Sequence, residues 1–215
     1  MTGRHVQVIA TGAATVHVAA SAATFVVCAD GGVRSALHAG RRIDLVVGDL
    51  DSATATDLAA ARAAGARIER FPTAKDESDL ELAMAAALAA EAASVTVHLR
   101  DGGRLDHQLA NLLVLASRRW RSVRVDAWVG DDRVWVVHES VVLPLAVGAA
   151  LAVQAVTGPA TVTTRGLAFP LEGEVLDAAE ARGIANEVVA TPVEVRVDTG
   201  VVLVIGSTDQ SAHAT

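Results

Sequence analysis

Two aspartates separated by one residue directly follow an apolar run. Asp49 and Asp51 come after Val46-Val47-Gly48 and precede Ser52. Side chains alternate between faces along an extended segment, so we expect the two carboxylates to point to the same side. Two oxygen ligands at the end of a strand suit Mg²⁺, which keeps several waters and usually works with phosphates. An Asp-x-Asp pair alone is a weak signal, and the residues placed beside it decide its meaning.

Three further clusters of charged residues and glycines follow β-rich runs. They are Ala29-Asp30-Gly31-Gly32, Lys75-Asp76-Glu77-Ser78-Asp79 and Gly102-Gly103-Arg104-Leu105-Asp106-His107. Because ligands of an open parallel sheet bind outside the carboxyl ends of its strands, we expect all four clusters at one edge. Glycines there let backbone amides approach an anion, and the planar Arg104 side chain can hold phosphate oxygens.

The charges of these clusters favour a complex of a polyphosphate with Mg²⁺. Lys75 and Arg104 stand beside several carboxylates, whereas calcium needs more oxygen ligands and zinc normally recruits Cys or His. Taken singly, the residues have ordinary roles, since Asp favours turns and helix starts and an isolated Arg104 would be solvated. His107, at a helix start, would be a structural hydrogen-bond donor. Together they indicate a functional site, because convergent charges tend to mark one.

The elements that must position these residues alternate between β-rich runs and alanine-rich helical stretches. We expect strands at Val6–Ile9, Phe25–Cys28, Asp44–Val47, Arg67–Phe71, Val95–Leu99 and Val123–Val129. We expect helices at Gly32–Ala39, Ala55–Ala64, Asp79–Ala92 and Asp106–Ser117. The alternation predicts an α/β fold in which helices cover a parallel sheet in three layers.

Two of these helices have recognisable starts. Ser78 and Glu81 have the spacing of a capping box, which places Asp79 in the first turn of its helix. Asp106 can cap the next helix. The residues of that helix expected to face the core are Leu109, Leu112 and Leu113.

The last third of the chain is β-rich without helical stretches. Val134–Val137 follows Gly130-Asp131-Asp132 and is interpreted as the return of a hairpin. Further strands are expected at Val141–Leu143, Ala149–Val156, Ala160–Thr164, Val193–Val197 and Val201–Ile205. This spacing predicts an antiparallel sandwich or barrel.

Composition and charge exclude several classes of protein. The formal charge of −7 argues against a binder of nucleic-acid backbones, which needs a basic face. The single cysteine, Cys28, excludes an internal disulfide and fits a reducing cytoplasm. No apolar run reaches the roughly 18 residues of a spanning helix, so we expect no membrane partner. The apolar N-terminal stretch loosely mimics a signal peptide, but its cleavage would remove the strand predicted at Val6–Ile9, so we expect a cytoplasmic protein.

Between about Phe25 and Ile205, six segments resemble those of the thiamine pyrophosphokinases in order and spacing. Four lie in the N-terminal part, namely Ala29–Gly32, Gly48–Ser52, Lys75–Ala83 and Gly102–Asn111. Two lie in the C-terminal part, namely Thr164–Leu171 and Gly183–Glu187. The Gly-Asp-x-Asp-Ser and Gly-Gly-Arg-x-Asp-His motifs are specific when both occur together.

The resemblance implies a two-domain enzyme. It implies an α/β domain for ATP and Mg²⁺ over residues 1–138, a β-sandwich domain for thiamine over residues 139–208 and a tail at 209–215. It also implies a homodimer with the active site at the subunit interface. The implied reaction moves the terminal pyrophosphoryl group of ATP to the thiamine hydroxyl, giving thiamine diphosphate and AMP.

The resemblance also implies roles for individual residues. The implied Mg²⁺ ligands are Asp49, Asp51 and Asp79, and the implied catalytic set adds Arg104 and Asp106. The implied ATP-binding residues are Asp30, Gly31, Lys75, Asp76, Gly103, Arg104, His107 and Asn111. The implied thiamine-binding residues are Gly166, Leu167, Phe169, Ala185 and Asn186. Either Asp79 or Asp106 would accept the hydroxyl proton.

Three features depart from the family pattern and leave alternatives open. Ala185 stands where the family commonly has Ser or Thr, Leu99-Arg100-Asp101 replaces a small, glycine-containing approach, and the loop after the first strand offers only Gly12. One alternative is a pyrophosphokinase for another hydroxymethyl heterocycle, such as a pterin. A second is a phosphatase of the haloacid-dehalogenase type with Asp49 as nucleophile, and a third is a non-catalytic sensor of nucleotide or thiamine.

Overall fold

The computed structural model describes residues 3–13, 15–17 and 24–207. Within them the chain forms two compact units, the first ending at Gly130 apart from Leu115–Arg118, and the second continuing from Asp131. The second unit therefore includes the strand Asp132–Val137 (β7), whereas the boundary predicted from the sequence follows residue 138. The tail predicted at 209–215 lies outside the described residues.

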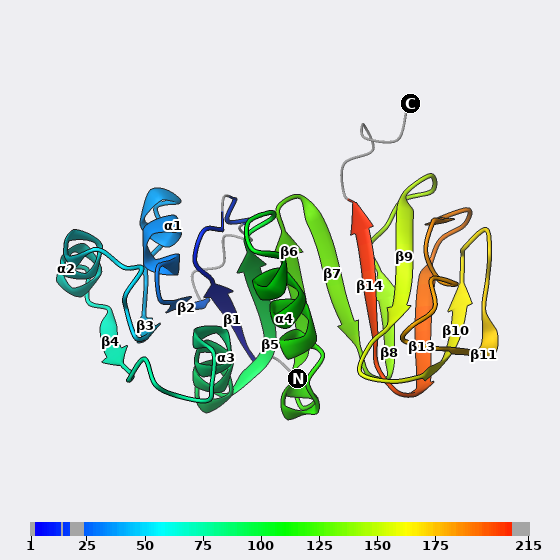
Figure 1. Ribbon diagram of the computed structural model, residues 1–215. Coiled ribbons are helices and arrows are strands. Elements are labelled where there is room, and N and C mark those ends of the chain that lie inside the picture. The colour runs from blue at the N-terminus through cyan, green and yellow to red at the C-terminus, as the bar shows by residue number, and fades with distance from the viewer. Residues whose placement is uncertain (1–2, 14, 18–23, 208–215) are drawn as a thin grey trace. The chain divides into compact units, whose positions relative to one another are not determined.

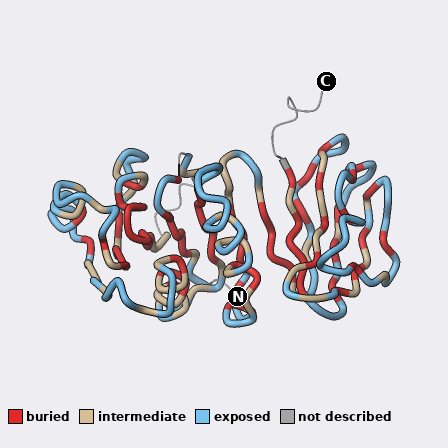
Figure 2. Tube along the Cα trace, viewed as in Figure 1, coloured by how far each residue is buried: buried red, intermediate tan, exposed pale blue. Residues whose placement is uncertain are grey.

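The first unit is built on a parallel sheet with the strand order β6-β5-β1-β2-β3-β4. Its strands are β1 (Arg4–Ile9), β2 (Phe25–Ala29), β3 (Leu45–Gly48), β4 (Arg67–Arg70), β5 (Ala92–Leu99) and β6 (Arg124–Val129). Most of β1, β2 and β3 is buried without alternation (Figure 2), as expected when helices cover both faces of a sheet. The predicted parallel α/β arrangement is confirmed.

Helices lie on both faces of this sheet (Figure 1). They are α1 (Gly32–His38), α2 (Ala55–Ala63), α3 (Asp79–Ala89) and α4 (Leu105–Leu115), followed by the 3₁₀ turn η1 (Arg118–Trp120). Val33 and Ala36 of α1 share one core with Ile9 and Cys28, while α3 contacts β2 and β3 without joining that core. Within the described residues, none of the helices combines the length and the apolar character needed to cross a membrane.

Helix α4 differs from the expectation in both its start and its outer face. It begins at Leu105, so Asp106 lies inside the first turn rather than at the cap. Leu105, Leu109 and Leu113 are 78%, 57% and 41% exposed, although Leu109 and Leu113 were expected in the core. Spacing of four residues shows that leucines share one face of a helix, but it does not show what covers that face.

The second unit is a sandwich of two antiparallel sheets. One has the strand order β12-β9-β14-β7, formed by Asn186–Glu187, Ala150–Ala155, Val202–Ser207 and Asp132–Val137. The other has the order β11-β10-β13-β8, formed by Glu172–Leu176, Ala160–Arg165, Val193–Thr199 and Ser140–Leu143. Side chains from both sheets, such as Val153, Val162 and Val195, form one core. The predicted sandwich is confirmed, while β11 and β12 were not predicted because Glu172–Leu176 is polar and β12 is very short.

Candidate active site

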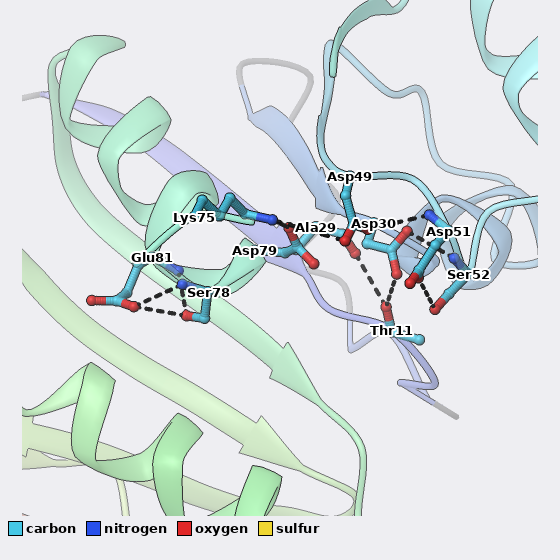
Figure 3. Close-up of polar contacts among 10 residues, drawn as sticks. All are labelled: Thr11, Ala29, Asp30, Asp49, Asp51, Ser52, Lys75, Ser78, Asp79 and Glu81. Atoms are coloured by element: carbon cyan, nitrogen blue, oxygen red, sulfur yellow. Dashed lines mark hydrogen bonds and ion pairs between the residues drawn. The ribbon is translucent and has the colours of Figure 1, made fainter. Parts of the chain in front are cut away.

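Three carboxylates converge at the carboxyl edge of the parallel sheet. Asp30 follows β2, Asp49 follows β3, and Asp79 is the first residue of α3. One oxygen of each carboxylate lies within 4.8 Å of the others, and Figure 3 shows them gathered beside Lys75. A cluster of this kind is expected where successive parallel strands end.

The close approach of these carboxylates depends on Gly48, the last residue of β3. Gly48 has a φ of +139°, a conformation that residues with a side chain rarely adopt. A Cβ atom there would lie 3.0 Å from Asp79 Oδ1 and 3.2 Å from the Cβ of Asp30. The absent side chain therefore leaves the space in which two of the carboxylates meet.

Asp51 lies apart from this cluster. Leu50 adopts a φ of +64° and is 5% exposed, so its side chain is buried and the backbone is not extended between the two aspartates. Asp51 instead accepts a hydrogen bond from Ser52 Oγ at 3.0 Å and donates its backbone N–H to Asp49 Oδ1 at 3.2 Å. Asp30 therefore takes the third place in the cluster, and a metal-binding role for Asp51 stays a prediction.

Lys75 provides the positive charge beside the cluster. Its Nζ lies 3.0 Å from Asp79 Oδ1 and 4.0 Å from Asp49 Oδ2, and its side chain is only 12% exposed. Burial by itself would lower the pKa of Lys75, but the hydrogen bond that Lys75 donates to Asp79 and the charges of Asp79, Asp49 and Asp30 outweigh it and raise the pKa. Lys75 is therefore a cation throughout the neutral range.

The loop after β1 contributes Thr11, which the sequence analysis missed. Thr11 Oγ1 donates to Asp30 Oδ2 and to the carbonyl of Ala29, both at 3.4 Å. The other oxygen of Asp30 accepts the backbone N–H of Ser52 at 3.2 Å (Figure 3). Thr11 follows a strand of the parallel sheet, so its position at the strand end was the one available signal for it.

The start of α3 orients Asp79. Ser78 Oγ accepts the backbone N–H of Glu81 at 3.2 Å, and the Glu81 carboxylate accepts the backbone N–H of Ser78 at 2.9 Å. These reciprocal bonds form the predicted capping box. Because Asp79 follows Ser78 directly, the cap fixes the backbone that carries this carboxylate.

A cavity of about 440 Å³ opens next to the carboxylates within the first unit. The predicted site residues that line it are Lys75, Asp79, Gly103, Arg104, His107 and Asn111. Residues that line it without having been predicted include Thr11, Ser78, Arg100 and Gln108. Four of the residues predicted in the first unit, namely Gly31, Asp51, Asp76 and Asp106, neither line this cavity nor belong to the carboxylate cluster.

Arg104 and Asp106 are paired with each other at the N-terminus of α4. Arg104 Nε and Nη2 donate to the two oxygens of Asp106 at 3.1 and 2.5 Å. The hydrogen bond from Arg104 is the main cause that lowers the pKa of Asp106 to about 2, and the backbone N–H of His107 contributes. Asp106 is therefore a weak base at neutral pH.

Three of the five predicted residues of the second unit, namely Leu167, Phe169 and Asn186, line a smaller cavity of about 120 Å³, whereas Gly166 and Ala185 do not. Asn186 is 8% exposed and uses its side-chain amide within the protein. Its Oδ1 accepts the backbone N–H groups of Phe169 and Glu187 at 3.1 and 2.9 Å, and its Nδ2 donates to the Phe169 carbonyl at 2.8 Å. Asn186 thus holds the backbone of Phe169, whose side chain is 69% exposed.

The other predicted residues of this unit have distinct positions. Leu167 is buried in the sandwich core, and the carbonyl of Gly166 accepts two backbone N–H groups from the segment around Ala190. Ala185 is exposed and has a φ of +54°. Arg182, which was not predicted, lines the smaller cavity and forms an ion pair with Glu174.

Comparison with protein families decides which enzymes this chain resembles as a whole. The family model described as thiamin pyrophosphokinase, catalytic domain, matches residues 16–127, and the one described as thiamin pyrophosphokinase, vitamin B1 binding domain, matches residues 143–202. The chain belongs to the thiamin pyrophosphokinase family. It is therefore an enzyme that transfers a pyrophosphoryl group to thiamine, and the resemblance inferred from the sequence is confirmed.

Solved structures of thiamin pyrophosphokinases share this fold. The enzyme from Bacillus subtilis is 19% identical with a TM-score of 0.80, and the alignment covers 95% of this chain and 99% of that one. A family protein from Enterococcus faecalis is 22% identical with a TM-score of 0.78, covering 96% and 99%. The enzyme from Candida albicans is 14% identical with a TM-score of 0.74, covering 94% and 90%. A comparison with curated proteins gives no significant match.

Membership of the thiamin pyrophosphokinases resolves the alternatives that the sequence left open. The catalytic-domain match includes the segments that carry Asp30, Asp49 and Asp79. The vitamin B1 match includes Phe169 and Asn186. The family assignment thus favours thiamine as acceptor over a pterin, and an enzyme over a sensor or a phosphatase with Asp49 as nucleophile.

Proposed function

We propose that the cavity of the first unit binds ATP with Mg²⁺ and that the thiamine hydroxyl attacks the β-phosphorus, releasing AMP. The observation that carries this proposal is the convergence of Asp30, Asp49 and Asp79 beside Lys75, at the edge of a cavity that Gly103 and Arg104 also line. Three carboxylates with one nearby ammonium suit a metal-bound polyphosphate better than they suit a neutral ligand.

The donor set fits Mg²⁺. Three carboxylate oxygens within 4.8 Å of one another are hard ligands, and crowded carboxylates repel one another unless a cation lies among them. We propose Asp49 and Asp79 as ligands, with Asp30 in the place that the resemblance implied for Asp51. When bound, Mg²⁺ neutralises negative charge on the phosphate oxygens.

The remaining residues bind and orient the reactants. Lys75 holds Asp79 and Asp49 in place and presents its charge to the phosphates, while Arg104, His107 and Asn111 lie along the cavity wall. Charge that builds on the leaving AMP and on the non-bridging oxygens is thereby stabilised, and in-line placement of the hydroxyl supplies much of the remaining acceleration.

Asp79 is the better placed of the two candidates for the proton acceptor, because it lines the cavity and Asp106 does not. The pKa of Asp106 is lowered to about 2, chiefly by the hydrogen bond from Arg104, so this carboxylate takes up a proton poorly at neutral pH. We propose that Asp106 serves to orient Arg104. Asp79 lies in the carboxylate cluster and lines the cavity, where it can meet the attacking hydroxyl.

Thiamine is proposed to bind through the second unit. Phe169 is exposed, and among the phenylalanine and tryptophan residues that the structure describes it has the most exposed ring. An aromatic ring of thiamine can stack on it. Gly166 and Ala185 lie in the neighbouring turns, and Asn186 contributes by holding the Phe169 backbone. The two units are thus proposed as the ATP-binding and thiamine-binding domains.

We further propose a homodimer with the active site at the subunit interface and a cytoplasmic location. Leu105, Leu109 and Leu113 form an exposed apolar stripe along α4, and such a stripe on a helix is typical of a surface that another chain covers. The single cysteine, Cys28, is buried and free, as is common in a reducing compartment.

Product analysis tests the proposed reaction. The protein is incubated with MgATP and thiamine, and in parallel with a hydroxymethylpterin and a hydroxymethylpyrimidine, and the products are measured by mass spectrometry. We expect AMP and thiamine diphosphate in equal amounts with thiamine alone. Inorganic phosphate without AMP, or diphosphorylation of another acceptor in preference to thiamine, would contradict the proposal.

A further inference from the structure

We infer that Arg100 is a phosphate-binding residue of the nucleotide cavity. This inference rests on the proposed function, because it takes ATP as the ligand of that cavity. Arg100 was not among the site residues predicted from the sequence, and its position and charge environment carry the argument.

The backbone places Arg100 at the carboxyl edge of the sheet. It directly follows Leu99, the last residue of β5, whose side chain is 4% exposed. The last five residues of β5 are all buried, and the chain becomes exposed at Arg100, one residue beyond the strand. Arg100 itself is exposed and lines the cavity together with Lys75 and Arg104.

Two glycines make room for the Arg100 side chain. A Cβ atom at Gly12 would lie 2.9 Å from Arg100 Cδ, and one at Gly103 would lie 3.4 Å from both Nε and Cζ. The aliphatic part of Arg100 therefore passes over the loop after β1, and its guanidinium lies against the loop after β5. Gly12 has a φ of +77°, so glycine is favoured there by conformation as well as by space.

The cations that line the cavity differ in what neutralises them. Lys75 is bound to Asp79 at 3.0 Å, and Arg104 makes two hydrogen bonds to Asp106. Among the described residues, Arg100 has no hydrogen bond or ion pair. Within the described part of the chain, its positive charge and its five N–H donors are therefore unused.

An unneutralised guanidinium in this cavity suits the phosphate chain of ATP. A guanidinium can give two parallel hydrogen bonds to a phosphate, which a lysine ammonium cannot do with the same geometry. The three carboxylates nearby would repel a polyphosphate, and Arg100 adds an uncompensated positive charge that opposes this repulsion. The adenosine part of the ligand carries no charge for it to recognise.

The binding of MgATP and of adenosine to Arg100→Ala, Arg100→Lys and wild-type protein tests this inference by calorimetry. We expect Arg100→Ala to weaken MgATP binding about tenfold, because a hydrogen bond to a charged group contributes this much, and Arg100→Lys to recover part of the loss. Adenosine binding should be unchanged. In steady-state assays the KM for MgATP should rise about tenfold, while kcat and the KM for thiamine change less than about threefold.

A control and a second variant separate the local role of Arg100 from other effects. Arg62→Ala removes the same charge from the exposed face of α2 and should bind MgATP as the wild type does. Gly12→Ala places a Cβ atom against the Arg100 side chain and should also weaken MgATP binding. In the Arg100→Ala background, Gly12→Ala should reduce the affinity for MgATP less than it does in the wild type. The clash with the Arg100 side chain is then gone, while the backbone strain at residue 12 is the same.

The outcomes distinguish this inference from the proposed function. If the wild type forms AMP from ATP and thiamine but Arg100→Ala binds MgATP equally well, the role of Arg100 is wrong and the function stands. If Arg100→Ala weakens the binding of adenosine as much as the binding of MgATP, the residue acts on the shape of the cavity and the inference is overturned. If the wild type itself does not bind MgATP, both proposals fail.

Discussion

Asp30, Asp49 and Asp79 place three carboxylates within a small volume, and Lys75 supplies one nearby positive charge. This imbalance is the main electrostatic property of the site, because like charges at such distances repel one another until a cation binds. Replacing a carboxylate of the cluster should therefore reduce activity much more than replacing an acidic residue a few positions away that lies outside it.

Asp49 and Asp51 form a matched pair for testing this difference. Asp49→Asn should lower kcat/KM by about 100-fold or more, because it removes an oxygen from the cluster. Asp51→Asn should lower kcat/KM by less than about threefold, because Asp51 faces Ser52 instead. Rates of AMP formation are measured over a range of Mg²⁺ concentrations. Equal losses in the two variants would show that Asp51 is a ligand and that the observed turn at Leu50 opens on metal binding.

The pair of Arg104 and Asp106 leads to a prediction about pH. A carboxyl group whose pKa is lowered to about 2 is ionised above that value and takes up a proton only as the pH falls toward it. Replacing Asp106 by Asn should therefore reduce kcat/KM by the same factor at every pH between about 5.5 and 9. The pH–rate profiles of both proteins are compared, and a loss that becomes smaller on the acidic side, where the wild type would itself lose activity by protonation, would identify Asp106 as the titrating base.

At the scale of elements, the site depends on where strands end and how helices start. Asp30, Asp49 and Arg100 directly follow parallel strands and Asp79 begins α3, so local backbone geometry determines the direction of these side chains. Caps and turns therefore affect activity as well as stability.

The caps of α2 and α3 allow these two effects to be separated. Ser78→Ala and Thr54→Ala each remove a side chain that accepts a backbone N–H at a helix start, and each should cost about 1 kcal/mol of stability. Only Ser78→Ala should also reduce kcat/KM, because only α3 begins with a carboxylate of the cluster. Thermal unfolding and steady-state rates are measured for both, and equal rates in the two variants would contradict a role of the cap in positioning Asp79.

The loop that carries Phe169 provides a second test at this scale. Asn186→Ala removes two hydrogen bonds to the Phe169 backbone and should raise the KM for thiamine about tenfold, with little change in the KM for MgATP. Asn186→Asp keeps the acceptor for the Phe169 N–H and should recover part of the affinity. A rise in both KM values, accompanied by a lower melting temperature, would indicate a general structural role.

At the scale of the whole molecule, the exposed stripe of α4 is the feature that a single chain does not explain. Leu105, Leu109 and Leu113 are all more than one third exposed, and burying such side chains favours association.

The proposed dimer predicts a specific effect of these leucines. The wild type should have twice the mass of a 22.1 kDa chain in light scattering, and Leu109→Lys should shift it toward the monomer, because a buried lysine without a partner is costly. Val175→Lys, which changes an equally exposed apolar residue on β11, serves as the control. A wild type that is monomeric at micromolar concentration would contradict the dimer.

The sequence by itself determined the fold class and the order of the main elements, and it predicted Asp30, Asp49 and Asp79 as members of one site. Periodicity and composition are local properties and can be read without coordinates. Motifs such as Gly48–Ser52 and Gly102–His107 are likewise short runs of particular residue types, so they can be recognised in the sequence itself. The capping box of Ser78 and Glu81 was predictable for the same reason, since it depends on residues three positions apart.

Only the tertiary structure decided which of these residues meet. The positive φ of Leu50 directs Asp51 away and leaves Asp30, from a different strand, beside Asp49 and Asp79. The structure also shows that Arg104 is bound to Asp106, whereas Arg100 has no partner among the residues that the structure describes. These outcomes depend on contacts between segments far apart in the chain, and the spacing of residues along a sequence does not contain that information.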